Sequence, residues 1–459
     1  MSRRVAMAVA LLGLVACDPA PGPINTPVLT ATPSSTSSPG GDPAPITEGD
    51  VTELSINGMT VLVKRIPGAE LAAIQLYVKG GARNWGAADA GVENLAVSVA
   101  TSGGTSKLDK DTYARRLAAL GSDIGASSGN DFSVFGAKAL TTKLDETFDI
   151  LCDTFLSPAL PASELELQRQ NMLLRLHHEE ESPDARLGLL SHRSLFKGHP
   201  YENRAVGTIE SVTKLTAEQT KAHLAKLRES SRLLLVVVGD VDAAHIADLA
   251  RQKLGGLPRG SFKDAPMPGL SFSKSQVGVT SDKLPTNYIQ GVFAAPSWRD
   301  RDFYAAMVGM EHLGFRMFEE VRTKRNLSYA PKAAYRFGGG VPTGVLYVTA
   351  VDPATTIKVM FDEVKKLQSE KLSPKQLEAA KSTFLTGSLM GTETTDGQAS
   401  SLARAQMFAG DWRVQKTLLD HVKAVSADDV QTFAKKHIGK LQFQIVGNAS
   451  IDKGLFGSL

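Results

Sequence analysis

The hydrophobic pattern of the chain alternates between strand-like and helix-like segments from Thr52 onward. Two apolar runs at 59–66 and 72–79, separated by Pro67 and Gly68, are typical of strands. Apolar positions at helical spacing follow, and an unbroken apolar run closes the region. The predicted helices cover 90–101, 111–120, 143–156, 162–181 and 216–226, and the predicted buried strand covers 232–239. This order predicts an α+β domain.

The same order of elements returns after a joint rich in Gly and Pro at 255–269. The second series has predicted strands at 276–281, 288–294, 344–351 and 441–446 and predicted helices at 301–325, 354–369, 374–389, 397–408 and 426–436. Two halves of about 200 residues therefore share one plan. We predict an α+β fold of two homologous α/β-sandwich halves, 49–265 and 266–459, each an antiparallel-rich sheet with helices packed on it.

The first 17 residues have the pattern of a bacterial export signal. Arg3 and Arg4 precede an apolar stretch at 5–16, which is shorter than the roughly 20 residues that a membrane-spanning helix needs. The end of the stretch, Leu14-Val15-Ala16-Cys17, resembles the bacterial lipobox, whose cysteine is acylated and becomes the new N-terminus. We expect a lipoprotein signal peptide with lipidation at Cys17. A plain secretory signal is the alternative.

The segment at 18–48 consists largely of Pro, Ser, Thr and Gly. Such a composition cannot bury enough apolar surface to fold, so it predicts a disordered linker between the membrane and the folded part. The expected location is the bacterial cell envelope, with the protein facing the periplasm. The sequence leaves open whether the inner or the outer membrane holds it.

The composition limits the classes of function that the chain can serve. With 459 residues, 42% of them hydrophobic, it is too long for a single core. A net charge of +3 and the lack of a dense Lys/Arg tract argue against a nucleic-acid partner. If Cys17 is acylated, Cys152 has no partner for a disulfide. Its apolar helical surroundings predict a buried small hydrophobe rather than a reactive thiol.

Six short segments resemble the signatures of a known family. In chain order they are Gly80-Gly81-Ala82-Arg83, Gly91-Val92, Gly103-Gly104-Thr105, His199-Pro200-Tyr201, Gly207-Thr208 and Val237-Val238-Gly239-Asp240. Together with the duplicated α+β half, they resemble the pitrilysin/insulinase (inverzincin) family of zinc metallopeptidases over about residues 50–450. The resemblance implies two halves related by pseudo-two-fold symmetry, which form half of a clam-shaped chamber.

Active members of that family bind zinc through an H-x-x-E-H helix, in which two histidines face the metal and the glutamate activates water. Aligned on Gly91-Val92, the motif falls on 94–98, where Asn94, Val97 and Ser98 replace its three functional residues. The third ligand of the family, a glutamate, aligns with Arg175, whose guanidinium has no lone pair for a metal. The resemblance thus implies that this chain binds no zinc and that a partner subunit carries it.

A dense group of candidate ligands at 177–181, His-His-Glu-Glu-Glu, offers an alternative metal site. Only residues three or four apart share a helix face, so the segment supplies ligand pairs such as His177 with Glu181 but no closed site. We interpret it as the solvated polar end of a helix. His199-Pro200-Tyr201 is interpreted as structural.

The segment at 318–329, FEEVRTKRNLSY, resembles the family motif L-F-x-x-[VL]-R-E-x-x-G-L-[AS]-Y. Arg322 and Tyr329 keep its seven-residue spacing, while Thr323 replaces a glutamate. Asn326 replaces a glycine, a change that asparagine's tolerance of left-handed backbone angles accommodates. In active relatives this pair binds the substrate backbone and stabilises developing oxyanion charge at the zinc site. The alternative is that Arg322 lies in a solvated helix end and Tyr329 packs at a strand edge.

The sequence therefore predicts a non-catalytic subunit of a two-chain zinc peptidase. In this hypothesis Arg322 and Tyr329 act in trans on a peptide bound at the H-x-x-E-H zinc site of a partner, while the chain alone is inactive. A catalytically dead scaffold or assembly lipoprotein of the same fold is the main alternative, and an independent zinc peptidase is a third. The nearby Gly338-Gly339-Gly340 is either a flexible segment at the chamber or an ordinary loop.

Overall fold

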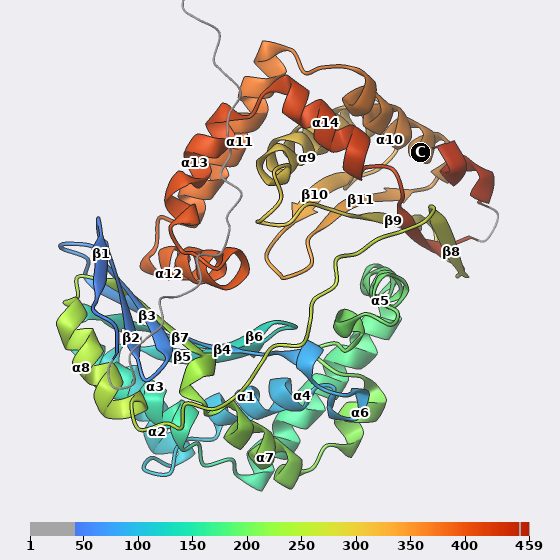
Figure 1. The fold of residues 1–459 in the computed structure, drawn as a ribbon. Coiled ribbons are helices and arrows are strands. Elements are labelled where there is room, and N and C mark those ends of the chain that lie inside the picture. The colour runs from blue at the N-terminus through green and yellow to red at the C-terminus, as the bar shows by residue number, and fades with distance from the viewer. Residues whose placement is uncertain (1–41, 449–450, 459) are drawn as a thin grey trace, which may run out of the picture. The chain divides into compact units, whose positions relative to one another are not determined.

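The computed structural model of the protein describes residues 42–448 and 451–458. The N-terminal half contains a seven-stranded sheet in the order β1-β2-β3-β7-β4-β6-β5 (Figure 1). Its strands are β1 (Ile46–Glu48), β2 (Val51–Ile56), β3 (Met59–Arg65), β4 (Leu71–Lys79), β5 (Asp123–Ser128), β6 (Phe132–Leu140) and β7 (Leu233–Gly239). Neighbouring strands are antiparallel except for β3 and β7, which are parallel. The two apolar runs predicted near the start, β3 and β4, are separated by β7.

Helices of the same half cover one face of this sheet (Figure 1). Those in contact with its strands are α1 (Val92–Ser102), α2 (Lys110–Leu120), α3 (Leu144–Leu156) and α8 (Ala243–Leu254). Three more, α4 (Ala162–Glu181), α6 (Ile209–Lys214) and α7 (Ala217–Leu227), pack on α1 or on each other. Cys152 lies in α3 and is 1% exposed, which confirms the prediction of a buried small side chain.

The C-terminal half contains a five-stranded sheet in the order β10-β11-β9-β12-β8. Its strands are β8 (Gln276–Ser281), β9 (Asn287–Ala294), β10 (Lys332–Arg336), β11 (Thr343–Ala350) and β12 (Gln442–Gly447). Its helices are α9 (Phe303–Met317), α10 (Pro353–Ser369), α11 (Pro374–Gly391), α12 (Thr395–Arg404), α13 (Val414–Ala424) and α14 (Ala427–His437).

The two sheets have the same plan. Five strands of the first sheet, β3-β7-β4-β6-β5, correspond in order to β8-β12-β9-β11-β10 of the second. The single parallel pair also recurs, as β3 with β7 and β8 with β12. In both halves one helix, α1 or α9, packs against the strand at the sheet edge, β5 or β10. The predicted α+β fold with two homologous halves is confirmed.

Each half also supplies one helix to the other half's sheet. Helix α12 packs on β4 and β7, and α5 (Pro183–Leu195) packs on β9 and β12. The apolar sequence of β7 explains the first contact. Alternate residues Leu233, Leu235 and Val237 face the core beneath α1, while their neighbours on the strand lie in a cluster with Leu402 of α12 and the buried Trp412. A strand buried on both faces is apolar at successive positions, as the sequence predicted.

Several elements were not predicted, and one predicted boundary was wrong. Helices α5, α6, α8 and α13 and strands β1, β2, β5, β6 and β10 are present beyond those expected. The predicted disordered linker at 18–48 extends too far, because Ile46–Glu48 forms β1 and pairs with β2. The Glu48 carboxylate pairs with Arg413 at 2.7 Å, and the Glu48 backbone carbonyl accepts from Lys416. Cys17 and the signal peptide lie outside the described residues.

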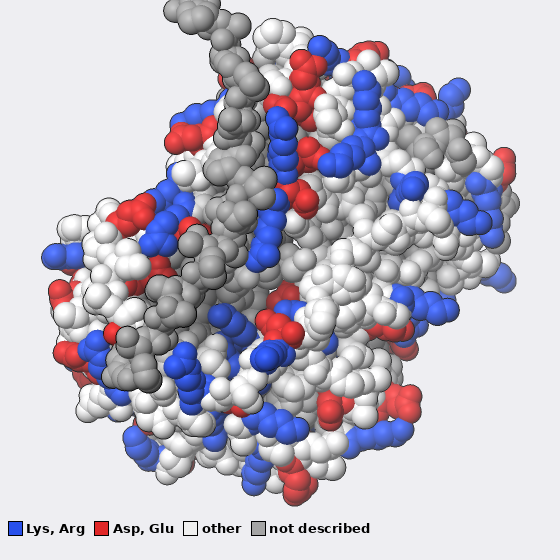
Figure 2. All heavy atoms as spheres, in the orientation of Figure 1, with Lys and Arg blue, Asp and Glu red and all other residues white. Residues whose placement is uncertain are grey.

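The surface in view carries both signs of charge, scattered over most elements (Figure 2). This distribution agrees with the small net charge of +3. No helix within residues 42–448 and 451–458 is long and apolar enough to cross a membrane.

Candidate functional site

Helix α9 ends in a widened turn that carries Arg322. The turn, η6 (Phe318–Thr323), is π-helical, and the Lys324 amide donates to the carbonyl of Glu319, five residues earlier, at 2.9 Å. Such widened turns are rare and often occur at functional sites. The chain then reverses at Asn326, whose φ of 52° is left-handed. The prediction that asparagine would tolerate the position of the family glycine is confirmed.

A network of ion pairs holds this turn in place. Glu320, 5% exposed, accepts from Arg316 and Lys324 at 2.7 Å each and from Arg325 at 2.5 Å. Arg316 also contacts Glu319 and the buried Glu363 of α10, at 2.7 and 2.9 Å. Hydrogen bonds from Lys324 and then Arg325 lower the pKa of the Glu320 carboxyl to about 2. Sequence analysis missed this network, although the four-residue spacing of Arg316, Glu320 and Lys324 indicates it.

Arg322 is held by two aromatic rings rather than by carboxylates. Its guanidinium carbon lies 4.9 Å from the ring centre of Phe318 and 4.3 Å from that of Tyr329. This contact brings together the two residues predicted to act as a pair. Cation–π stacking uses the face of the guanidinium and leaves the N–H groups at its edge available. Among residues 42–448 and 451–458, no hydrogen bond or ion pair engages the Arg322 side chain.

Tyr329 is 78% exposed, and Phe318 is 45% exposed. Phe315, one turn earlier on α9, is 66% exposed, so a third aromatic side chain lies on the surface of this helix end. The alternative interpretation required Tyr329 to pack at a strand edge. Its high exposure shows that it does not. The preceding residue, Ser328, fixes the chain to β11, because its hydroxyl accepts from the Thr349 amide at 3.1 Å.

The positions aligned with the family's zinc ligands lie on α1. Asn94 and Ser98, one turn apart, are partly exposed on the same face of the helix. The Asn94 amide donates to the hydroxyl of Ser128 in the edge strand β5, at 3.2 Å. Val97, in the position of the family's glutamate base, is 0% exposed and part of the hydrophobic core. This face of α1 has the expected orientation of a ligand face but carries only an amide and a hydroxyl.

Arg175 lies on α4, which packs against α1. The two helices run in opposite directions, because Gln168 of α4 donates to Ser102 at the end of α1 while Leu176 lines a cavity with Ala90 before its start. This direction brings Arg175 level with the first turns of α1. Its side chain is exposed and makes no hydrogen bond or ion pair with any other described residue.

These four positions do not fit a zinc ion. None offers an imidazole, thiolate or carboxylate, and the guanidinium of Arg175 is a permanent cation. Among the described residues, no group of three His, Cys, Asp or Glu side chains is placed to hold a metal.

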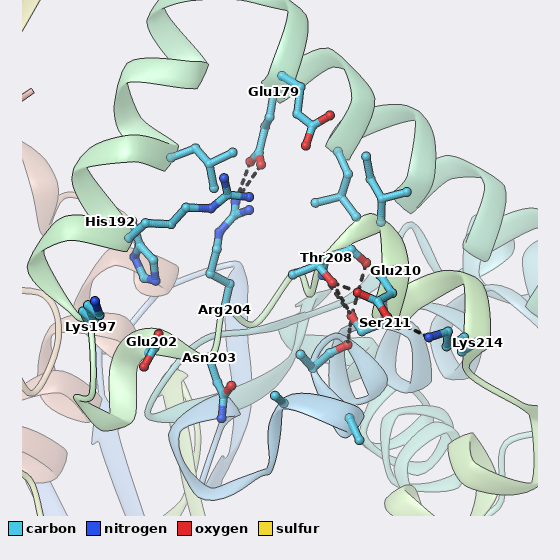
Figure 3. A pocket seen from close by; sticks show the side chains of 18 of the residues that line it. Glu179, His192, Lys197, Glu202, Asn203, Arg204, Thr208, Glu210, Ser211 and Lys214 are labelled. Atoms are coloured by element: carbon cyan, nitrogen blue, oxygen red, sulfur yellow. Dashed lines mark hydrogen bonds and ion pairs between the residues drawn. The ribbon is translucent and has the colours of Figure 1, made fainter. Parts of the chain in front are cut away.

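The ligand-rich end of α4 lies beside a cavity of about 1060 Å³ (Figure 3). There the Glu179 carboxylate accepts twice from Arg204, at 2.7 and 2.8 Å. His177 and His178 are exposed, and His192 lines the cavity without facing Glu179 (Figure 3). Glu179 is thus occupied by a structural ion pair, in agreement with the interpretation of this segment as a polar helix end.

Two glycines from separate family signatures meet at the start of α1. Gly91, with φ of 90°, caps the helix, and Gly207 has φ of 74°. A Cβ on Gly207 would lie 2.7 Å from the Ala90 carbonyl oxygen and 3.0 Å from the Gly91 Cα. Both positions therefore require glycine, for backbone angle and for close approach. These signatures support the fold rather than chemistry.

Tyr201 of the predicted structural signature is buried and links the two halves. Its hydroxyl donates to Asp131, and the Gly340 amide donates to the Tyr201 oxygen at 2.8 Å and to Asp131 at 3.1 Å. His199 accepts from the Tyr201 amide at 3.0 Å. The structural interpretation of His199-Pro200-Tyr201 is confirmed. The glycine segment at 338–340 is therefore held against the first half by hydrogen bonds.

A buried charged group adjoins Asn94 and was not predicted. Glu93 is 3% exposed and contacts His223 and Trp85, at 2.9 and 2.8 Å, and also Ser133. Burial acts to raise the pKa of Glu93, but the hydrogen bonds, led by that of His223, hold it below its usual value. Its partners come from three separate segments, so no local sequence pattern reveals the group.

Comparison with known proteins supplies the family. The model described as "Insulinase (Peptidase family M16)" matches residues 60–209, and that described as "Peptidase M16 inactive domain" matches residues 214–384. The two models belong to one family and together cover most of the chain, from residue 60 to residue 384. The chain therefore belongs to the insulinase (M16) peptidase family, as the signatures predicted.

Relatives of known name agree with this assignment. An uncharacterized zinc protease of Mycobacterium leprae is 23% identical over 394 residues, which cover 83% of this chain and 88% of the relative. The mitochondrial-processing peptidase subunit beta of Saccharomyces cerevisiae is 19% identical over 421 residues, which cover 86% and 90% of the two chains.

The fold also matches solved structures. The crystal structure of a peptidase M16 inactive domain from Pseudomonas fluorescens superimposes with a TM-score of 0.79 and 20% identity. The match covers 88% of this chain and 99% of that one. At this level of identity the similarity supports the fold alone.

Proposed function

We propose that this chain is the non-catalytic subunit of a two-chain zinc peptidase. In this proposal a second family member carries the intact H-x-x-E-H helix and its zinc, and the present chain supplies Arg322 and Tyr329 to the peptide bound there. One observation carries the proposal. Arg322 contacts two aromatic rings and makes no hydrogen bond or ion pair with a described residue, whereas its neighbours Arg316 and Arg325 are engaged in ion pairs.

The chemistry of the pair fits the task. The planar fork of Arg322 can donate two parallel hydrogen bonds to a peptide carbonyl or an oxyanion, and the exposed Tyr329 hydroxyl adds a third donor. Because the turn is fixed by Glu320 and Ser328, these donors are oriented before substrate arrives. Preorganised donors stabilise developing negative charge more than water does. Bond cleavage itself requires the water-activating glutamate, which Val97 replaces here, so that step belongs to the partner.

The first test is reconstitution. The mature chain and the family member with an intact H-x-x-E-H motif from the same organism would be purified separately and mixed. We expect cleavage of a fluorogenic peptide only in the mixture, with zinc bound by the partner. Tyr329→Phe should lower kcat by about 10-fold or more, while Arg301→Ala, an exposed change before α9, should leave it unaltered. Full activity of the partner alone would contradict the proposal.

The scaffold alternative predicts a different outcome. A chain that serves only assembly has no use for the donors of Arg322 and Tyr329, so Tyr329→Phe would leave turnover as unchanged as the control Arg301→Ala does. Association of the two subunits, followed by size-exclusion chromatography, is expected under both hypotheses and serves as the folding control.

We also propose that acyl chains on Cys17 hold the protein at the periplasmic face of a bacterial membrane. Metabolic labelling with a palmitate analogue should mark the wild-type chain and not Cys17→Ser, which should appear in the soluble periplasmic fraction. Unchanged membrane association of Cys17→Ser would contradict this part of the proposal.

A further inference from the structure

A cavity of about 350 Å³ lies where the two halves meet. It is bounded by the end of β4 at Lys79, the β5–β6 turn at Asp131, and the segment after β9 at Trp298 and Arg299. Gly339 and Gly340 close another side. A Cβ on Gly340 would lie 3.0 Å from an Asp131 carboxylate oxygen, so the glycine allows this close approach. The volume lies within the range of small-ligand sites.

The charges that line this cavity do not balance. The lining carboxylates are Asp131 and Asp264, and both pair with Arg83, at 3.2 and 3.1 Å. Asp131 is further occupied by Tyr201 and the Gly340 amide. Lys79 and Arg299 also line the cavity, and their side chains make no hydrogen bond or ion pair within the described parts of the chain. Three cations against two carboxylates leave the cavity with an excess of one positive charge.

The Lys79 ammonium is a cation in a partly desolvated place. Burial lowers its pKa, because removing water disfavours the charged form, and the nearby Asp264 offsets this effect only in part. An anionic ligand would relieve this cost. Part of the wall is apolar and is formed by Trp298, Phe408 and Met407, among other side chains. The cavity thus combines a site for one negative charge with room for an apolar group.

We propose that this cavity binds the C-terminal carboxylate of a peptide whose last residue is apolar. Lys79 and Arg299 would bind the carboxylate, and the last side chain would pack on Trp298 and Phe408. A monoanion matches the single excess charge, and the apolar wall favours a peptide terminus over an inorganic ion. The choice of a peptide as ligand rests on the proposed peptidase function. The consequence is an anchoring subsite separate from the Arg322 turn, which favours substrates with free apolar C-termini.

Binding to the chain alone tests this inference. A fluorescein-labelled hexapeptide ending in leucine would be titrated by anisotropy, as the free acid and as the C-terminal amide. We expect the amide to bind about tenfold or more weakly, because it lacks the charge that Lys79 and Arg299 recognise. Lys79→Met and Arg299→Gln should each weaken binding of the acid about tenfold and reduce its advantage over the amide. Arg301→Gln removes the same charge two residues away and should have no effect.

The exposed Arg299 keeps the test valid if Lys79→Met fails to fold. Equal binding of acid and amide would overturn the proposal, as would unchanged binding by Arg299→Gln. Inorganic phosphate that displaces the peptide with equal or higher affinity would overturn the peptide assignment in favour of a simple anion site. Because the assay needs neither partner nor zinc, its result is independent of whether Arg322 contributes to turnover.

Discussion

Helices α1 and α9 hold equivalent places in the two halves, but their chemistry differs. On α1 the partly exposed face carries Asn94 and Ser98. Val97, which aligns with the family's catalytic glutamate, is buried in the core. Helix α9 ends in a π-helical turn, where Arg316, Lys324 and Arg325 pair with Glu320 and Arg322 stacks on Tyr329. In the proposed function, the first half no longer supplies the zinc-site groups, whereas the second half still supplies Arg322 and Tyr329.

The largest expected effect comes from restoring the glutamate on α1. Val97→Glu should destabilise the protein by about 3–5 kcal/mol, since it places an unpaired carboxylate in the core. Ser98→Glu, on the partly exposed face, should cost less than about 1 kcal/mol. Urea unfolding followed by circular dichroism measures both. Similar stability of the two variants would show that α1 still accommodates the catalytic residue.

On α9, removing the central carboxylate should have an intermediate effect. Glu320→Gln should lower the free energy of unfolding by about 1–2 kcal/mol, a value reduced because Lys324 and Arg325 are half-exposed. It should also lower turnover of the reconstituted pair, since the turn that orients Arg322 loosens. The matched control is the exposed Glu180→Gln, which should change neither quantity. Loss of stability without loss of turnover would show that the ion pairs of Glu320 stabilise the fold but do not orient Arg322 for turnover.

The same carboxylate predicts an acid dependence. Its pKa in the folded protein, about 2, lies below the ordinary 4.5, so the unfolded chain binds the proton more readily. Its contribution to stability is therefore present above about pH 4.5 and is lost as the pH falls from there toward 2. The difference in unfolding free energy between wild type and Glu320→Gln should be smaller at about pH 3 than at about pH 7. A constant difference would contradict the assigned pKa.

The smallest expected effect concerns the left-handed residue after the turn. Asn326→Ala should cost about 1 kcal/mol, because an alanine Cβ is strained at positive φ, while Asn326→Gly should be neutral or slightly stabilising. Thermal unfolding of the two variants, measured side by side, checks this. Equal melting temperatures would indicate that the backbone changes conformation in the alanine variant.

The sequence predicted most of the fold because its patterns are local. The repeated order of strands and helices, the doubly buried β7 and the spacing of Arg322 and Tyr329 are all properties of short segments. Helix α5 was missed because its apolar residues are buried by β9 and β12 of the other half, a contact that local pattern does not reveal. Strand β1 was missed for a similar reason, since Glu48 is held by Arg413, more than 300 residues away.

The candidate site was predictable in identity but not in geometry. Spacing and family motif selected Arg322 and Tyr329, yet neither indicates that their side chains stack on each other or that Phe318 also contacts the arginine. The cavity beside Lys79 lay beyond prediction altogether. It joins β4, the β5–β6 turn and the segment after β9, which become neighbours only after the two halves pack.

The most direct test of the divided site is the kcat of the reconstituted pair carrying Arg322→Ala. The side chain is at the surface, so the variant should fold and associate with its partner as the wild type does. We expect kcat to fall by about 100-fold or more while the zinc content of the partner is unchanged, because one preorganised donor set is lost from the transition state. Wild-type turnover by this variant in an intact, zinc-loaded pair would contradict the account.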